Sequence, residues 1–579
     1  MKKAKWALIT MTSLIMIVVA AACGGAAAPE TITVVETVVV EKEVQGETVT
    51  VVETVVVEKE VEKVVEVEVP AEPAAKSGTL VIAANKFPSG FEPHVNVAWE
   101  SLYIMSAVYD TLVYMDPETG NIVPGLATSW EVSDDGTTYT FHLRDDVTFH
   151  DGTPFNAEAV KFNLDRMVNP ETKSQKAGSL LGPYESSEVI DEYTVQVNLS
   201  ESYSFLLEGL SLNYTAMYSP AAVEQWGADY AIHQVGTGPF MIKEVEVDDH
   251  ITLVPNPDYN WAPEFFENQG PPYLEEITWI FLPEPATQLP ALEAGDADIT
   301  LSFPPSDSGQ LLSQGNLDLR ITNLVGQPLY WFMNVEKSPT DDIRVRKAIL
   351  YGTDRETAIN IVLRGMYPVA NGPMTAASAE YNPEVEGMYP YDPEAAKALL
   401  EEAGWTDSDG DGIRDKDGEP LTISMILQGW GFIGPLGEVL QAQLREIGIN
   451  VEAEQLSFPA QMEAAGSGER NMAVMGGSGF FSDDTLSGFF HSSNADGGFN
   501  WSKVRDPELD AMLDQGAQTL DPEARQEIYN QVQMKIMEDA LILPVYDYVF
   551  ITGLNDRVQG IVWDRTGLVP YFNEAYIAQ

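Results

Sequence analysis

The distribution of apolar residues along the chain predicts β-strands in two ways. Residues Gly78–Ala84 form a short and almost unbroken apolar run, which is typical of a buried strand. Between Trp130 and Leu143, apolar and polar residues alternate on both sides of an Asp134-Asp135-Gly136 turn. Alternation around such a turn predicts a β-hairpin.

A spacing of three to four residues between apolar positions predicts helices elsewhere. It is found in Asn156–Met167, Pro393–Ala403 and Phe432–Ile447, and a glycine, which commonly ends a helix, follows each of the last two. Ile449–Glu454 has the pattern of a strand and comes directly after the third helix. Because strands alternate with helices, and because 579 residues are too many for one core, we expect two or more α/β lobes.

The first residues have the pattern of an export signal. Three lysines within the first five residues precede the apolar run Trp6–Ala22, which ends in three alanines before Cys23. This arrangement resembles a bacterial lipobox, which implies a signal peptide over residues 1–22 and lipid on the Cys23 sulfur. A plain signal peptide and an uncleaved N-terminal anchor stay open, because Ala20 stands where Leu is commoner. With a single cysteine, no disulfide can form within the chain.

Residues 23–77 are low in complexity. The twelve residues Thr33–Val44, TVVETVVVEKEV, recur 17 positions later at Thr50–Val61. The segment lacks aromatic residues and cannot build a core of its own, so we expect a flexible spacer that lifts the folded lobes off the membrane. A short coiled coil or a β-prone oligomerisation strip is the alternative, because valine is dense there.

Acidic residues outnumber basic residues by 89 to 32, which gives a net charge of -57. Such a surface repels nucleic acid and anionic membranes, so we expect no nucleic-acid partner, and membrane attachment through the lipid anchor only. The charge is spread over the whole chain. Solubility in salty surroundings and a preference for cationic ligands both stay open as its purpose.

A longer motif resembles a known family. Residues Trp130–Val160, WEVSDDGTTYTFHLRDDVTFHDGTPFNAEAV, are similar to the signature of the bacterial extracellular solute-binding proteins of family 5, which serve oligopeptide, dipeptide and nickel importers. The resemblance extends over about residues 78–575. Five further motifs follow in that family's order: Gly236–Phe240, Asn256–Tyr259, Ala291–Asp298, Asp342–Ala348 and Tyr391–Gly404.

The resemblance implies the type II periplasmic-binding fold of the large peptide-binding cluster. Lobe I would cover residues 78–325, with an inserted subdomain at about 106–232, lobe II residues 326–545, and residues 546–579 would return to lobe I. The chain would be a monomer held outside the cytoplasm on the cell membrane, without catalytic residues or a required cofactor. It would capture a solute between its lobes and pass it to an ABC permease with separate ATPase subunits.

A closing cleft needs apolar walls and a few polar groups that point at the ligand. Aromatic residues near the expected cleft and hinge are the natural wall candidates, and Trp430, flanked by glycines, is the strongest of them. The candidate residues are Phe91, Trp99, Tyr330, Trp331, Asn334, Trp430 and Phe480.

Peptide binders of the family hold the peptide's ammonium with an aspartate in a Trp-x-x-Asp-like stretch. The corresponding stretch here, Gly476–Thr485, lacks the tryptophan, and Asp483 or Asp484 could serve as the anchor if the loop shifts. An oligosaccharide or another neutral solute would suit an aromatic cleft equally well. Nickel is less favoured, because no two of the six histidines have metal-ligand spacing.

One acidic loop resembles a calcium-binding loop. Asp407, Asp409, Asp411 and Asp415 occupy its positions 1, 3, 5 and 9, with Gly412 at position 6, and the candidate ligand set also includes Ile413. The glutamate expected at position 12 is replaced by Gly418. A structural calcium ion and a solvated acidic turn both stay open.

The chain lacks three familiar catalytic motifs: Gly-x-Ser-x-Gly, His-Glu-x-x-His and the phosphate-binding Gly-x-x-x-x-Gly-Lys. Paired carboxylates could still come together in space, so a surface hydrolase is carried as a distant alternative. A sensor that uses the same binding cleft is another. Turnover of a bound solute would separate a hydrolase from a binding protein.

Overall fold

The computed structural model describes strands at 33–44 and 47–58 and then residues 76–578, without positions 89, 97, 302, 306, 312–314, 430 and 478. Cys23 and Trp430 therefore lie outside the described residues. The chain divides into two compact units, Met1–Pro73 and Ala74–Gln579. Among the helices that are described, none is both long and apolar enough to cross a membrane.

The first unit contains a β-hairpin. Strands β1 (Thr33–Val44) and β2 (Glu47–Glu58) pair antiparallel over their full length, from Thr33 opposite Glu58 to Val44 opposite Glu47. Over these two stretches the structure has paired strands rather than a flexible coil. Valine and threonine favour the extended backbone, which explains this preference.

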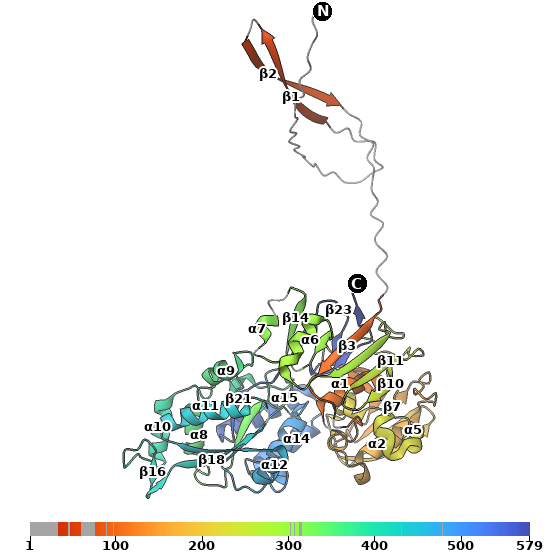
Figure 1. Cartoon of the computed structure of the whole chain (residues 1–579). Coiled ribbons are helices and arrows are strands. Elements are labelled where there is room, and N and C mark those ends of the chain that lie inside the picture. The colour runs from red at the N-terminus through yellow and green to blue at the C-terminus, as the bar shows by residue number, and fades with distance from the viewer. Residues whose placement is uncertain are drawn as a thin grey trace, which may run out of the picture. The chain divides into compact units, whose positions relative to one another are not determined.

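A seven-stranded mixed sheet forms the centre of lobe I (Figure 1). Its central strand β3 pairs in parallel with β12 and β13, and all other pairs are antiparallel. In spatial order the strands are β10 (Phe240–Glu246), β11 (His250–Pro255), β12 (Glu276–Phe281), β3 (Thr79–Ala84), β13 (Ile299–Thr300), β22 (Val549–Asn555) and β14 (Leu317–Asn323). The helices of this part are α1 (Trp99–Val108), α6 (Gln288–Ala294) and α7 (Ser308–Leu311).

A separate four-stranded antiparallel sheet lies within the stretch between β3 and β10. The predicted hairpin is confirmed as β6 and β7, and Gly136 has φ 69° in the turn between them, a left-handed conformation that glycine adopts without strain. The predicted helix is confirmed as α2, whose N-cap Asn156 accepts a hydrogen bond from the Ala159 N–H at 3.0 Å. The elements are β4 (Val113–Met115), β5 (Ile122–Pro124), β6 (Ala127–Val132), β7 (Thr138–Leu143), α2 (Ala157–Val168), α3 (Ala177–Leu180), β8 (Tyr184–Asp191), β9 (Thr194–Leu199), α4 (Leu206–Ser211) and α5 (Pro220–Trp226).

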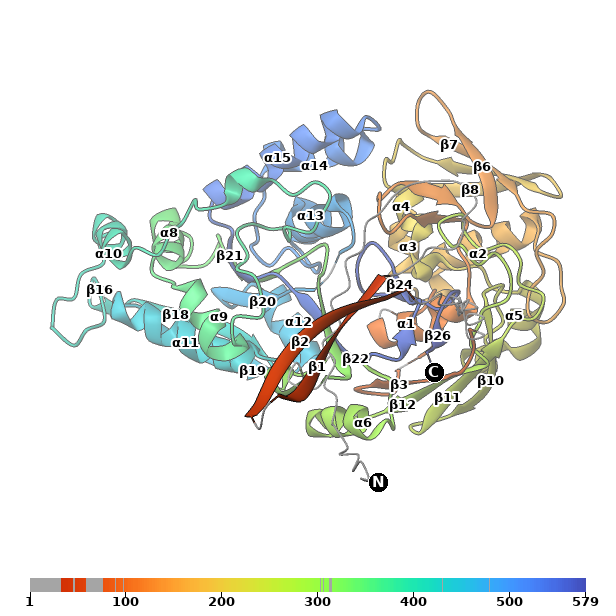
Figure 2. The same cartoon turned by 90° about the horizontal axis from the view of Figure 1, so that it is seen from above.

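Lobe II is built on a five-stranded mixed sheet flanked by helices (Figure 2). Its spatial order is β19 (Asn450–Leu456), β18 (Thr422–Gln428), β20 (Met472–Met475), β15 (Leu329–Met333) and β21 (Ile542–Tyr546). The two helices predicted here are confirmed as α10 and α11, and the strand after them as β19. The helices are α8 (Ile343–Tyr351), α9 (Arg355–Leu363), α10 (Pro393–Glu402), α11 (Ile433–Glu446), α12 (Phe458–Gly466), α13 (Ser482–Phe490), α14 (Pro507–Gln518) and α15 (Pro522–Glu538).

Two extended segments connect the large sheets. The chain leaves the seven-stranded sheet after β14 and enters the five-stranded sheet at β15, and it returns between β21 and β22. These crossing segments are bonded to each other, because the Leu324 N–H donates to the Tyr548 carbonyl at 2.9 Å. A third segment of the chain contacts them through Ser378, whose hydroxyl oxygen accepts the Gly326 N–H at 2.9 Å. The hinge between the lobes is therefore a hydrogen-bonded unit.

Candidate functional site

The lobes touch each other along one edge of the space between them. Phe205, beside α4, stacks on Phe481, beside α13, with ring centroids 5.0 Å apart and planes 10° from parallel. The Ser204 N–H donates to the Ala517 carbonyl of α14 at 2.8 Å. Figure 2 shows α3 and α4 facing α13 and α14 at this edge. The structure therefore has the lobes in direct contact.

The predicted anchors Asp483 and Asp484 lie at this contact. Asp484 forms an ion pair with Lys176 from the other lobe, and its second oxygen accepts the Phe480 N–H at 3.1 Å. Asp483 accepts hydrogen bonds from Ser487 and, at 3.1 Å, from the Tyr203 hydroxyl of the other lobe. Burial raises the pKa of Asp483, and these two bonds oppose the rise. Both carboxylates thus have partners inside the protein.

Aromatic side chains converge between the lobes. The loop of lobe II that contains Gly476, Gly477 and Gly479 is called the glycine loop here. Trp99 at the start of α1 faces this loop, since a Cβ on Gly477 would lie 3.3 Å from Trp99 Cη2 and 3.5 Å from Tyr548 Cε2. Phe480 faces Tyr214 of the other lobe with ring centroids 5.8 Å apart. Trp99 and Phe480 are both half-buried, so each keeps part of its ring open. Two predicted wall residues are therefore brought to one interlobe region.

Polar side chains are buried at the hinge beside this region. Gln327 and Tyr330 are 1% and 0% exposed. Apart from each other's side chains, the Gln327 carboxamide and the Tyr330 hydroxyl have no hydrogen-bonding partner among the described residues. The Gln327 carbonyl accepts the Gly477 N–H at 3.0 Å, which holds the glycine loop against the hinge. Buried polar atoms without partners are costly, so such atoms are candidates for contact with a ligand.

Asp547 is a functional candidate that sequence reasoning missed. It lies in the segment between β21 and β22 and is 4% exposed. One carboxylate oxygen accepts the Ala376 N–H at 3.0 Å, and the other has no hydrogen-bonding partner among the described residues. Burial raises the pKa of Asp547 to about 7. Its neighbours in sequence, Tyr546 and Tyr548, gave an aromatic signal that could have drawn attention to this segment.

The other predicted wall residues lie elsewhere. Trp331 is fully buried and donates its indole N–H to the Ile426 carbonyl at 3.1 Å. Phe91 is 4% exposed and packs edge-on against Phe87 at 5.3 Å. Asn334 uses its side-chain amide on two backbone carbonyls, at 3.0 and 3.1 Å. These three side chains pack or form hydrogen bonds within the fold, and so they have a structural role.

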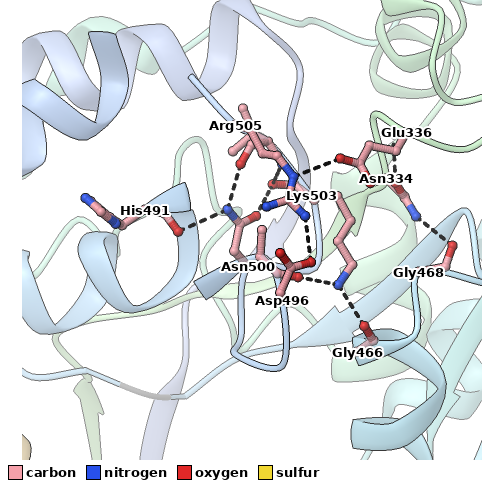
Figure 3. A network of polar contacts seen from close by, with 12 residues as sticks. Asn334, Glu336, Gly466, Gly468, His491, Asp496, Asn500, Lys503 and Arg505 are labelled. Atoms are coloured by element: carbon pink, nitrogen blue, oxygen red, sulfur yellow. Dashed lines mark hydrogen bonds and ion pairs between the residues drawn. The ribbon is translucent and has the colours of Figure 1, made fainter. Parts of the chain in front are cut away.

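Asn334 belongs to a polar network in lobe II (Figure 3). Lys503 donates to the carbonyls of Gly466 and Ala495, and Arg505 pairs with Asp496 at 2.7 Å and with Glu336 at 3.0 Å. The network borders a polar surface hollow of about 480 Å³. Because its charged groups neutralise one another, it stabilises loops rather than presenting a free binding group.

A second charged cluster bridges the lobes. Arg525 of α15 bonds Glu380 at 3.0 Å and lies 3.9 Å from Glu208 of α4 in the other lobe. Burial raises the pKa of Glu208 to about 7. The Arg525 guanidinium also lies over the Phe205 ring, 4.8 Å from its centroid. The edge contact therefore combines stacked rings with a titratable carboxyl group.

The acidic loop brings three carboxylates together. Oxygen atoms of Asp407, Asp409 and Asp411 lie within 4.8 Å of one another, and all three residues are exposed. Asp415 instead accepts hydrogen bonds from the Ser408 N–H and hydroxyl, and Ile413 donates its N–H to Asp411 at 2.8 Å. Carboxylate oxygens at this spacing suit a hard cation such as Ca²⁺. The first three members of the predicted set are thus assembled, and the last two shape the loop.

This arrangement, two α/β lobes joined by crossing segments with aromatic and polar side chains between them, defines a two-lobed solute-binding protein. Residues 121–498 match the model of the bacterial extracellular solute-binding proteins, family 5. The chain therefore belongs to that family.

Individual relatives cover most of the chain. Heme-binding protein A of Haemophilus influenzae is 29% identical in an alignment 537 residues long, which covers 86% of this chain and 92% of that protein. Glutathione-binding protein GsiB of Escherichia coli O157:H7 is 30% identical in an alignment 498 residues long, which covers 84% of this chain and 92% of that protein. Among solved structures, NikA from Brucella suis in complex with Fe(III)-EDTA has a TM-score of 0.76 and 27% identity, with 86% of this chain and 99% of that chain covered.

Proposed function

We propose that this chain captures a small, peptide-like solute between its two lobes and delivers it to the permease of an ABC importer. Attachment to the cell membrane through lipidated Cys23, outside the cytoplasm, is part of the proposal, as is the absence of any catalytic step. The named ligands of the relatives, heme and glutathione, differ widely, so family membership supports the capture of a solute and leaves its chemistry to the site.

The observation that carries the proposal is the set of buried polar atoms at the hinge. Gln327 and Tyr330 offer a carboxamide and a hydroxyl next to the glycine loop, where Trp99 and Tyr548 supply apolar surface. A peptide presents amide donors and acceptors together with apolar side chains, and both kinds of group find counterparts here.

The test is a thermal-shift screen of the mature chain against short peptides, oligosaccharides, heme and Ni²⁺. A ligand that binds the native state raises the melting temperature, so peptides should raise it and the Gln327→Met variant should lose that rise. The control is Gln526→Met, which changes a half-buried glutamine on α15 that bonds Asn530. If none of these solutes raises the melting temperature, the proposal fails.

A neutral oligosaccharide is the second candidate. The half-buried rings of Trp99 and Phe480 could stack on sugar rings. A rise with oligosaccharides alone would favour this candidate over a peptide.

A further inference from the structure

We propose that Asp547 binds a protonated amine of the solute, such as the free amino terminus of a peptide. This inference rests on the proposed function and names the group that would recognise the ligand. Asp547 is 4% exposed in the hinge, with one carboxylate oxygen accepting the Ala376 N–H and the other without a partner among the described residues.

The charges around Asp547 favour a cationic ligand. The groups that act on its carboxyl are the Ala376 N–H and the Glu386 carboxylate, and Tyr381 brings a phenol close to it. None of the groups that shift its pKa is a cationic side chain. A buried carboxylate without a counter-charge is costly, and it either takes up a proton or binds a cation. A ligand ammonium group would supply both the missing charge and a donor for the free oxygen.

The two aspartates expected to serve as anchors are engaged with other partners. Asp484 is paired with the Lys176 ammonium group, which already occupies the position that a ligand amine would take. Asp483 is bonded by Tyr203 and Ser487. Binding an amine at either residue would require breaking an interlobe contact, whereas binding at Asp547 breaks none that involves its free oxygen.

The experiment compares a pool of tripeptides with free amino termini with the same pool after N-acetylation. Native mass spectrometry and thermal shift would measure retention on the mature chain at pH 7.5. We expect the free pool to bind at least about ten-fold more tightly, because acetylation removes the charge that pairs with Asp547. The Asp547→Asn variant keeps an acceptor for Ala376 and should lose the preference, whereas Asp484→Asn should keep it.

The pH dependence gives a second readout on the unmodified protein. Asp547 must be ionised to hold an ammonium group, so affinity for the free pool should rise between pH 6 and about 7.5. It should fall above about pH 8, where a terminal amine loses its proton. The acetylated pool should show neither change.

Equal binding of the two pools, or a preference that survives in Asp547→Asn and disappears in Asp484→Asn, would overturn the inference while leaving solute capture intact. Binding of oligosaccharides alone would overturn it as well. If no tested solute is retained, the proposed function fails together with it. The acetylation comparison needs no variant, so equal binding of the two pools would overturn the inference even if Asp547→Asn does not fold.

Discussion

A carboxylate between the lobes can bind a ligand only if its oxygens are not already used within the protein. Asp484 and Asp483 have partners that lie 308 and 280 residues away in the sequence, Lys176 and Tyr203. No local pattern links residues so far apart, which is why both aspartates looked free in the sequence. Asp547, which no motif marks, keeps one oxygen available.

Glu208 provides a prediction at the same scale. It lies between the lobes with Arg525, Glu380 and Tyr139 around it, and burial raises its pKa to about 7. When the lobes separate, the carboxyl becomes solvated and its pKa returns towards the ordinary value of about 4.3. At pH values between these two pKa values, closing of the lobes is therefore coupled to protonation of Glu208. The closed form should gain stability as the pH falls from 8 to 5.

Small-angle scattering across this pH range would measure the effect as a decrease in the radius of gyration of the ligand-free protein. The side chain of the Glu208→Gln variant cannot titrate, so the radius of gyration of this variant should change less with pH. Glu224→Gln, on the neighbouring helix α5 at an exposed position, is the matched control and should behave as the unmodified chain. An unchanged slope in Glu208→Gln would contradict the assignment.

At the scale of elements, helix starts follow capping chemistry that is visible in the sequence. Asn156, Asp392 and Asp521 each accept a backbone N–H of the first turn, at 2.9 to 3.0 Å. Such caps stabilise a helix by about 1 kcal/mol relative to alanine, and they need only residues three positions apart. Of these three helices, α2 and α10 were predicted, and both predictions lie within one residue of the observed ends.

Calcium binding by the acidic loop can be tested directly. If Asp407, Asp409 and Asp411 bind calcium, adding Ca²⁺ should raise the melting temperature relative to EDTA, and the Asp409→Asn/Asp411→Asn double variant should lose most of that rise. Mg²⁺ should have a smaller effect, because it requires a stricter octahedral geometry.

The control for this test is Glu402→Gln, which removes an exposed carboxylate at the end of α10. It should respond to Ca²⁺ like the unmodified chain. An equal response in the double variant would show that the loop is a solvated acidic turn.

At the scale of the whole two-lobed unit, Ala74–Gln579, closure depends on contacts between surfaces that are distant in sequence. The stack of Phe205 on Phe481 forms an apolar part of the edge contact, and the Ser204 N–H donates to the Ala517 carbonyl beside it. A ligand that binds both lobes would add to these contacts and shift the population towards the closed form.

Phe481→Ala tests this account of closure. Removing an aromatic ring from a protein core lowers the free energy of unfolding by about 3–5 kcal/mol. Phe481 lies where the lobes meet, so a smaller loss of this kind should destabilise the closed form relative to the open form. We expect the ligand-free variant to show a larger radius of gyration in small-angle scattering. Phe499→Ala, at a 37% exposed position, should leave the radius unchanged, and an unchanged radius in Phe481→Ala would show that other contacts keep the lobes together.

The family resemblance predicted the two-lobed fold, and short-range sequence patterns predicted several of its elements. The Trp130–Leu143 hairpin, the three helices and the two strands were all found, since each is specified by residues within about a dozen positions. The candidate site was predicted less well. Trp331 and Asn334 had the right residue types for a cleft, but the sheet turns them towards the Ile426 carbonyl and the Gly468 carbonyl.

The sequence by itself therefore determined the local elements and the acidic loop, because propensity, capping and turn chemistry act between near neighbours, and its resemblance to the family gave the class of fold. Only the tertiary structure decided which polar groups are paired. Lys176 meets Asp484, and Tyr203 meets Asp483, because the folding of two lobes brings separate parts of the chain together. The same packing buries Asp547 and leaves one of its oxygens without a partner. Burial and pairing are properties of the assembled lobes, and they set which carboxylate is available to a ligand.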